Sequence, residues 1–458
     1  MYAMRGLWFE SALLPAGWAR NVRLTAADGR IERVASGVAP ADADERHAIG
    51  LPGLANLHSH AFQRGLAGLT ERRGSGGDSF WTWRELMYRF LERVGPEELE
   101  ALAALAFAEM LEAGFTRVGE FHYLHHDRDG SPFADPGELA ARLAAAASRT
   151  GIGLTLLPTF YAHGGFGGAP PGERQRRFIN DPERFVRLLE ASRSAVLALP
   201  DASVGVAAHS LRAVTPHELA EVVALARGGV IHIHIAEQLR EVDDCLAWSG
   251  RRPVQWLLDN APVDERWCLV HATHATDAEL QGVAARRAVV GLCPVTESSL
   301  GDGIFPAAGF LAAGGRFGLG TDSNIRIDAA EELRTLEYSQ RLAQRARNVL
   351  ATAPGASTGR SLFDAALAGG SQALRPPGSE PAGLAPGAPL DVVTLLRDHP
   401  SLIGRNEDEI LDSWIFAGDR SLIDCVWRAG ARLVSGGRHR DRVALEQGYA
   451  RALRRVLA

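Results

Sequence analysis

The chain has 458 residues, of which 46% are hydrophobic and 23% are charged, and its net charge is -6. This composition suits a soluble protein with a large core and more than one domain. The acidic balance and the lack of a basic tract exclude the cationic surface that a nucleic-acid backbone demands. No apolar run reaches the length of a membrane span, so we expect no membrane contact.

Cysteine and lysine usage narrows the class of protein further. The four cysteines are widely spaced and form no Cys-x-x-Cys pair, which argues against a disulfide framework and a sulfur-ligated zinc. The first 21 residues carry Glu10 inside their apolar stretch and lack the features of a signal peptide, so we expect a cytoplasmic protein. All 49 basic residues are arginine, which excludes a P-loop lysine, a Schiff-base lysine and a carbamylated lysine bridging two metals.

The chain reads as an α/β protein with four parts in order. Residues 1–50 and 381–437 contain short alternating strands and turn signals, and are predicted to form two halves of one small β-sandwich. Residues 51–380 alternate apolar runs with helical patterns, which indicates a (β/α)8 TIM-like barrel. Residues 438–458 carry apolar residues at helical spacing and are predicted to form a docking helix. The eight expected barrel strands end near His58, Glu120, Phe160, His209, Ala236, His271, Pro294 and Asp322.

Several barrel helices can be placed from apolar spacing and capping residues. We expect helices over Glu97–Ala113, Glu138–Arg149, Pro216–Ala226 and Glu331–Asn348, the third of them capped by Thr215. The candidate chemical residues lie at or just after the strand ends, where barrels of this kind place their active sites.

Three histidines and one aspartate at these strand ends predict a metal site. His58 and His60 project to one face of a strand, so both imidazoles can hold one cation. A lone His-x-His pair is weak, but His234 and Asp322 end two further strand-like runs. This ligand set suits one divalent ion, zinc or alternatively iron. Asp322 is also expected to take up the proton of the attacking water; its structural alternative is a helix cap before Glu331.

Two further residues are candidates for acid and base work. Glu237 follows His234 by three residues, so it can lean over the metal and deliver a proton to a leaving nitrogen; a surface position at a helix start is its alternative. His271 is expected to polarise the water or stabilise the tetrahedral intermediate. His232 is read as a hydrogen-bonded core histidine. The remaining strand-end histidines are read as loop residues without a role: His122, His125, His126 and His274.

These motifs together resemble the amidohydrolase superfamily and, within it, the formimidoylglutamate deiminases. The resemblance covers most of the barrel and both flanks. Related purine and adenosylhomocysteine deaminases tend to carry Ser-Asn where this chain has Thr296-Glu297. The segments that carry the resemblance are Leu-Pro-Gly-Leu-Ala-Asn-Leu-His-Ser-His-Ala-Phe-Gln-Arg from Leu51, His-Ile-Ala-Glu-Gln from His234, Val-His-Ala-Thr-His from Val270, Cys-Pro-Val-Thr-Glu-Ser-Ser-Leu-Gly-Asp-Gly from Cys293 and Gly-Thr-Asp-Ser-Asn from Gly320.

The resemblance implies a hydrolytic deimination in histidine breakdown. N-formimino-L-glutamate and water would give N-formyl-L-glutamate and ammonia, with one metal ion, and a homodimer is common among such barrels. A substrate with two carboxylates requires cationic or hydroxyl donors at the mouth of the barrel, and arginine binds carboxylates in a bidentate manner. By resemblance, the substrate-binding positions are Gln63, Arg84 in the Trp81–Arg84 loop, Tyr123, His209 and Arg212.

Three alternatives stay open at this point. A deaminase of the same barrel could act on an aminopurine, a pterin or an adenosylhomocysteine-like substrate, and would stack aromatic side chains at the mouth in place of two arginines. A metal-free relative could serve as a binding protein, although such relatives usually lose ligands and this chain keeps all four. The enzyme could also release formamide in place of ammonia, because the sequence does not say which bond breaks.

Overall fold

The computed structural model describes residues 6–74, 76–375, 379 and 382–458. Residues 1–5 of the predicted N-terminal half and most of the predicted boundary at 376–381 lie outside the described residues. Eight parallel strands pair in a ring that closes through the β5–β13 and β6–β7 pairs, so the predicted barrel is confirmed. The strands are β5 (Leu54–Ser59), β6 (Phe115–His122), β7 (Gly153–Phe160), β9 (Val206–Ser210), β10 (Ile231–Ile235), β11 (Trp267–His271), β12 (Val289–Leu292) and β13 (Arg316–Leu319), with the two-residue β8 (Ser203–Val204) beside β7.

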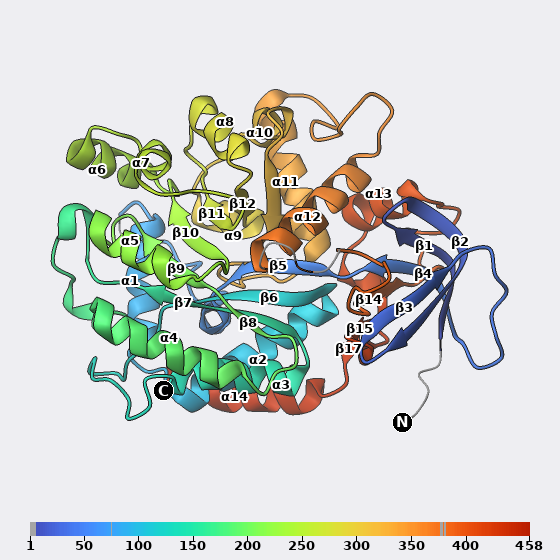
Figure 1. The fold of residues 1–458 in the computed structure, drawn as a ribbon, viewed down its shortest axis with the longest axis horizontal. Helices are drawn as coiled ribbons and strands as arrows, with labels where there is room; N and C mark the ends of the chain where they lie inside the picture. Colours follow the sequence, from blue (N-terminus) through green and yellow to red (C-terminus); the bar gives the residue numbers. More distant parts are fainter. Residues whose placement is uncertain (1–5, 75, 376–378, 380–381) are drawn as a thin grey trace.

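Helices surround this barrel on the left side of Figure 1. The predicted cap Thr215 is confirmed, since its side chain accepts a hydrogen bond from the Glu218 amide at the start of α5. The helix expected to run to Asn348 ends at Gln344, where Arg345 adopts a left-handed conformation. The helices are α1 (Phe80–Leu91), α2 (Pro96–Glu112), α3 (Glu138–Thr150), α4 (Pro182–Val196), α5 (Pro216–Leu225), α6 (Leu239–Ser249), α7 (Pro253–Asn260), α8 (Asp277–Ala285), α9 (Pro294–Leu300), α10 (Ala307–Ala312), α11 (Ala329–Gln344) and α12 (Thr358–Leu374), and short 3-10 turns include η1 (Ala61–Leu66).

Strands from both chain ends build a second sheet, to the right of the barrel in Figure 1. It is one hydrogen-bonded sheet in which β14 pairs with β4, and its two halves share a buried cluster that includes Phe9, Val392 and Trp427. The small domain predicted from both ends is therefore confirmed. Its strands are β1 (Leu7–Leu14), β2 (Gly17–Ala27), β3 (Arg30–Ala35), β4 (Glu45–Pro52), β14 (Val392–Leu395), β15 (Ile423–Arg428), β16 (Ala431–Ser435) and β17 (Arg438–His439).

Two helices in the C-terminal part attach it to the barrel. Helix α13 (Asp408–Ala417), which the sequence analysis did not anticipate, packs on α11 and α12 and buries Trp414. The predicted C-terminal helix begins at Arg442, because residues 438 and 439 form β17. This helix, α14 (Arg442–Leu457), docks on α2 through ion pairs from Arg442 to Glu109 at 3.2 Å and to Glu112 at 2.7 Å.

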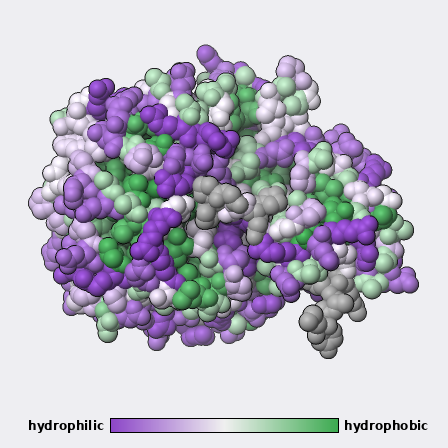
Figure 2. Space-filling model, in the orientation of Figure 1, coloured by the Kyte–Doolittle hydropathy of each residue, from purple (hydrophilic) through white to green (hydrophobic). Residues whose placement is uncertain are grey.

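The outer face of the molecule carries its hydrophobic residues in small groups. Figure 2 shows hydrophilic residues over much of one face, with hydrophobic ones gathered over parts of the barrel and of the small sheet. Small apolar groups of this kind are ordinary on a protein surface. Within the described residues, no helix has both the length and the apolar character required to cross a bilayer.

The end of α12 closes the barrel at the face opposite the strand carboxyl ends. The Leu374 carbonyl accepts a hydrogen bond from Thr155 and the Ala373 carbonyl accepts one from His232, which confirms His232 as a hydrogen-bonded core residue. One turn earlier, Gly369 lies against β13 so closely that an added Cβ would overlap the Phe317 carbonyl. Helix α12 can therefore reach β13 only through a residue without a side chain.

Gly369→Ala should lower the free energy of unfolding by about 3 kcal/mol, because a rigid backbone carbonyl cannot move aside for the methyl group. Gly448→Ala is the matched control, since Gly448 also lies within a helix and its added Cβ would meet nothing within 4 Å. That variant should raise the free energy of unfolding by about 1 kcal/mol. Urea unfolding of both proteins measures the difference, and equal effects would contradict the close packing of α12 on β13.

Candidate metal centre and active site

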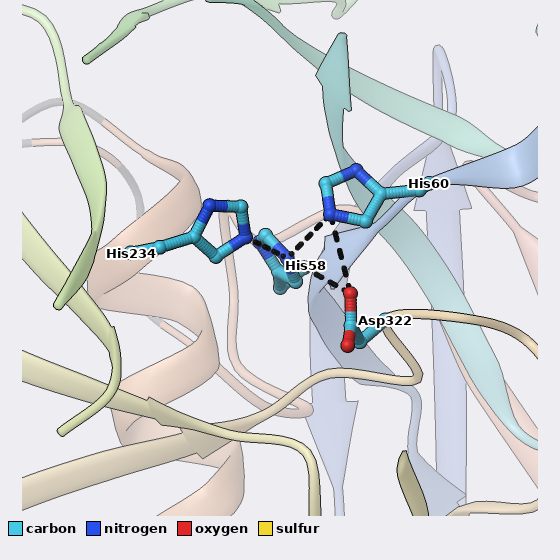
Figure 3. Close-up of side chains that lie close together, drawn as sticks. All are labelled: His58, His60, His234 and Asp322. Atoms are coloured by element: carbon cyan, nitrogen blue, oxygen red, sulfur yellow. Dashed lines mark hydrogen bonds and ion pairs between the residues drawn. The ribbon is translucent and has the colours of Figure 1, made fainter. Parts of the chain in front are cut away.

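Four side chains from three barrel strands meet at the carboxyl ends of β5, β10 and β13. The Nε2 atom of His58 lies 3.2 Å from that of His60 and 3.0 Å from that of His234. An Asp322 carboxylate oxygen lies 3.3 Å from His58 Nε2 and 3.2 Å from His60 Nε2. Figure 3 shows the rings of His234 and His60 on either side of His58, with Asp322 facing both members of the His58–His60 pair. The four ligands predicted from the sequence thus converge.

The orientation of the imidazoles leaves nitrogen lone pairs at the centre. His60 and His234 each donate from Nδ1 to a backbone carbonyl, of Phe121 and His209 respectively, both at 2.9 Å. A neutral imidazole carries one proton, so both Nε2 atoms face His58 as acceptors. Burial lowers the pKa of His58 to about 3. The imidazole of His58 is therefore neutral at pH 7, and no protonated ring competes with a metal cation for this site. Three imidazole nitrogens and one carboxylate fit a divalent metal ion.

The strand ends that carry these residues have unusual backbone conformations. Ala236, His271 and Asp322 have positive φ angles of 51°, 68° and 40°. Such conformations are rare for residues other than glycine and cost about 1 to 3 kcal/mol each. Asp328, not Asp322, caps α11 by accepting hydrogen bonds from its first amides, so the helix-cap alternative for Asp322 is wrong. The left-handed conformation of Asp322 after β13 instead directs its carboxylate toward His58 and His60.

Glu237 and His271 lie side by side above the ligands. The nearest atoms of the two, Glu237 Oε1 and His271 Nε2, are 3.9 Å apart. Burial raises the pKa of Glu237 to about 7, which lets this carboxyl hold a proton near neutral pH. Burial alone would lower the pKa of His271, but Glu237 and Glu297 raise it to about 10. Glu237 and His271 therefore titrate as a coupled pair, because an ionised Glu237 carboxylate favours a protonated His271.

Glu297, which lies in the Thr-Glu-Ser-Ser segment, is a site residue whose role the sequence did not predict. Its Oε1 atom lies 3.2 Å from His271 Nδ1 and accepts a hydrogen bond from the Cys293 amide at 2.9 Å. It therefore accepts the Nδ1 proton of His271 and orients the ring so that Nε2 faces Glu237. The signal available in the sequence was the replacement of Ser-Asn by Thr-Glu at this point of the barrel, but no spacing rule links Glu297 to His271.

A cavity with about 540 Å³ of empty space, part of it open to solvent, lies over the ligands. All five predicted substrate-binding residues line it, together with Glu237, His271 and Asp322. The Gln63 amide donates to the Tyr123 hydroxyl at 3.1 Å, while the Gln63 carbonyl oxygen has no partner among the described residues. Aromatic residues that the sequence analysis did not single out complete the wall: Phe80, Trp83, Tyr88, Tyr161 and Phe178.

Two placements differ from the sequence analysis. Arg84 lies on helix α1 and not in a loop, because Ser79 and Thr82 form a capping box that starts the helix at Phe80. His122 is the last residue of β6 and not a loop residue. The other three histidines without a role, His125, His126 and His274, do lie in loops.

Comparison with known proteins agrees with this geometry. The family model described as "Amidohydrolase family" matches residues 49–355, and the model "Formimidoylglutamate deiminase HutF, N-terminal domain" matches residues 4–48. The chain belongs to the amidohydrolase family. It is 52% identical to a formimidoylglutamate deiminase of Pseudomonas aeruginosa over 99% of both chains. It is 30% identical to an 8-oxoguanine deaminase of the same organism, over 71% of this chain and 73% of that one.

Solved structures share the architecture of this chain. A crystal structure of an amidohydrolase from Brucella melitensis superposes with a TM-score of 0.96 at 55% identity, covering 99% of this chain and 100% of that chain. An adenosine deaminase from Xanthomonas campestris with bound zinc superposes with a TM-score of 0.82 at 21% identity, covering 99% of both chains. At this lower identity the likeness shows the fold alone.

Removing the metal should destabilise the protein, because the cation joins three strands whose ligand atoms otherwise face one another unpaired. Treatment with a chelator should lower the thermal midpoint, and one equivalent of zinc should restore it. A metal held at 100 times its dissociation constant contributes about 2.7 kcal/mol. The variant Asp322→Asn should show a smaller response to the chelator. An unchanged midpoint after complete metal removal would contradict this role.

Proposed function

We propose that this amidohydrolase is a formimidoylglutamate deiminase, which converts N-formimino-L-glutamate and water to N-formyl-L-glutamate and ammonia in histidine degradation. The 52% identity to the Pseudomonas aeruginosa enzyme, over 99% of both chains, is the observation that carries this proposal. The match of residues 4–48 to the N-terminal domain of such deiminases supports it independently of the barrel.

In this proposal the two carboxylates of the substrate bind to Arg84 and Arg212 in the cavity wall. Neither guanidinium forms an ion pair with another described residue, and the Nε of each is buried without a hydrogen-bond partner there. Tyr123 and His209 supply further polar contacts around the carbon chain. Gln63 turns its unpartnered carbonyl oxygen toward the formimino group, where an N–H of the substrate can donate to it.

The reaction breaks the bond between the formimino carbon and its terminal nitrogen. His58, His60, His234 and Asp322 would hold one divalent metal ion, and such an ion lowers the pKa of a bound water from 15.7 to about 7. Asp322 takes one proton from the attacking water as its oxygen joins the formimino carbon, and Glu237 gives one proton to the terminal nitrogen. Asp322 then passes its proton to the same nitrogen, the carbon–nitrogen bond breaks with its electron pair on ammonia, and the remaining hydroxyl proton returns to Glu237 as the formyl carbonyl forms. His271, held by Glu297, stabilises the negative charge that develops at the tetrahedral carbon's oxygen.

The proposal also names the ion, the compartment and the assembly. Zinc suits three imidazoles and a carboxylate, and iron is the alternative that suits the same ligands. Four free, buried cysteines fit a reducing cytoplasm. A homodimer is the commonest closed assembly of soluble enzymes. Elemental analysis and sedimentation of the purified protein test the ion and the assembly.

Ammonia release from a panel of substrates tests the activity. N-formimino-L-glutamate should be turned over far faster than guanine, 8-oxoguanine or S-adenosylhomocysteine, because only the first carries two carboxylates for the two arginines. The products should be ammonia and N-formyl-L-glutamate, with no formamide. Preferred turnover of a purine would instead support the alternative deaminase, and formamide would show that the other carbon–nitrogen bond breaks.

Glu237→Gln should bind metal normally and lose turnover by about a hundredfold to ten-thousandfold, the range that general acid–base groups contribute. The amide keeps the size and polarity of the side chain but cannot deliver a proton. Glu221→Gln, an exposed carboxyl on α5, is the control and should be fully active. Near-normal turnover of Glu237→Gln would show that another group protonates the leaving nitrogen.

Arg212→Met should mainly raise KM, by about a hundredfold, because one charge-assisted pair to a substrate carboxylate is lost while the reacting groups stay in place. Arg251→Met is a suitable control, since Arg251 is exposed in the turn between α6 and α7. Steady-state kinetics measures both. A large fall in kcat with unchanged KM would place Arg212 at the reacting atoms.

A further inference from the structure

Three guanidinium groups gather on one tryptophan beside the cavity. The Cζ atoms of Arg84, Arg212 and Arg240 lie 4.6, 5.7 and 4.8 Å from the ring centre of Trp81. An indole face attracts cations within about 6 Å through its quadrupole. The three arginines come from α1, from the turn after β9, and from α6, so Trp81 is the point at which these separate segments meet.

Helix α1 presents this tryptophan through its periodicity. Trp81, Arg84 and Tyr88 are spaced three and four residues apart and so share one helix face. The Arg84 guanidinium also lies 5.5 Å from the ring centre of Tyr88, between the two aromatic rings. The capping box at Ser79 and Thr82 fixes the start of the helix next to Trp81. The aromatic pair therefore holds Arg84 along the helix, and of these two rings it is Trp81 that also lies under the Arg212 guanidinium.

The contacts of Trp81 also have an electrostatic component, because its partners are positively charged guanidinium groups. Among the described residues, neither Arg84 nor Arg212 forms an ion pair within 4 Å, although Glu241 and Glu237 lie near enough to raise the pKa of Arg212, and both guanidinium groups line the cavity. Like charges held together in this way repel each other. The π face of Trp81 offsets part of that repulsion without neutralising the charges. Arg240, whose side chain is 66% exposed, adds a third positive charge outside the cavity lining and lies 3.7 Å from Asp244.

We propose that Trp81 is a positioning residue for the dicarboxylate end of the substrate, because its indole holds the Arg84 and Arg212 guanidinium groups together at the cavity wall. Arg240 supports the same end through its charge and does not touch the substrate. This inference rests on the proposed function for the identity of the substrate. It assigns a binding role to a residue outside the cavity lining.

Trp81→Leu should raise KM for N-formimino-L-glutamate about tenfold and leave kcat within about twofold, because the guanidinium pair loses its support while the reacting groups are untouched. Trp81→Phe keeps a weaker aromatic face and should recover part of the loss. N-formiminoglycine, which has one carboxylate, should be affected less than N-formimino-L-glutamate. Trp248→Leu is the matched control, a half-buried tryptophan on α6 that stacks on Phe166, and its KM should not change.

A double-mutant cycle separates positioning from general packing. In an Arg84→Met background, Trp81→Leu should add less than about a twofold further change in KM, since the group on which it acts is already gone. Arg240→Gln should raise KM about threefold, with a weaker dependence on salt, whereas Arg251→Gln, of similar exposure and equal charge change, should not. Fully additive effects of Trp81 and Arg84, or an unchanged KM in Trp81→Leu, would overturn the inference.

Binding of glutarate, a dicarboxylate that is not turned over, keeps this test separate from the proposed reaction. Calorimetry should show weaker glutarate binding to Trp81→Leu than to the wild-type protein, at equal metal content and equal thermal midpoint. Wild-type protein that binds glutarate but releases no ammonia would refute the proposed function and leave the role of Trp81 standing. Equal glutarate affinity of the two proteins would refute the role of Trp81 alone.

Discussion

Electrostatic repulsion among four buried ligand atoms is the constraint on which the rest of this structure depends. Three imidazole nitrogens and a carboxylate oxygen lie within 4.8 Å of one another, each at 3.0 to 3.3 Å from at least one of the others, and backbone carbonyls already take the Nδ1 protons of His60 and His234. No arrangement of the remaining protons satisfies all four atoms, whereas a divalent cation does. The ligands belong to strands far apart in the sequence, so the cation also ties the barrel together at its catalytic end.

Barrel closure is what brings these ligands into register. The β5–β13 seam is short, with one strand pair between Leu319 and Asn56, but a polar network extends it beyond the strand ends. The Asn56 side chain donates to the Thr321 hydroxyl, and the Thr321 and Asp322 amides both donate to the His58 carbonyl at 3.0 Å. Asn324 donates to the His60 carbonyl from the other side. These contacts bind the first ligand pair to the last ligand before any metal is present.

The metal ligands were predictable because their signal is local. A His-x-His pair at the end of an apolar strand fixes the side-chain direction by strand periodicity alone, and strand ends of a parallel barrel meet at one face. Glu297 gave no such signal, because only the closed barrel brings His271 near it, and Trp81 likewise meets Arg212 only in the assembled molecule. Helix α13 was not predicted for a similar reason. It packs on α11 and α12, which are distant in the sequence, so its apolar spacing could not be recognised before those helices were placed. Arg84 lines the cavity but lies on a helix in place of the predicted loop, because the capping box at Ser79 starts α1 before it.

The cavity carries both acidic and basic side chains, and these come from different elements of the fold. Glu237 and Asp322, which follow β10 and β13, line the cavity near the metal ligands, and Glu297 lies behind His271. The cationic groups Arg84 and Arg212 come from α1 and from the turn after β9 and line the same cavity. A formimino group is basic and takes up a proton readily, while the glutamate end of the proposed substrate carries two negative charges. A molecule with that charge pattern can enter in one orientation at low cost, and the reverse orientation would bury each charge against its like. Orientation is thereby set by the scaffold's charges before any bond is broken, which leaves the acid and base groups to act on a single carbon–nitrogen bond.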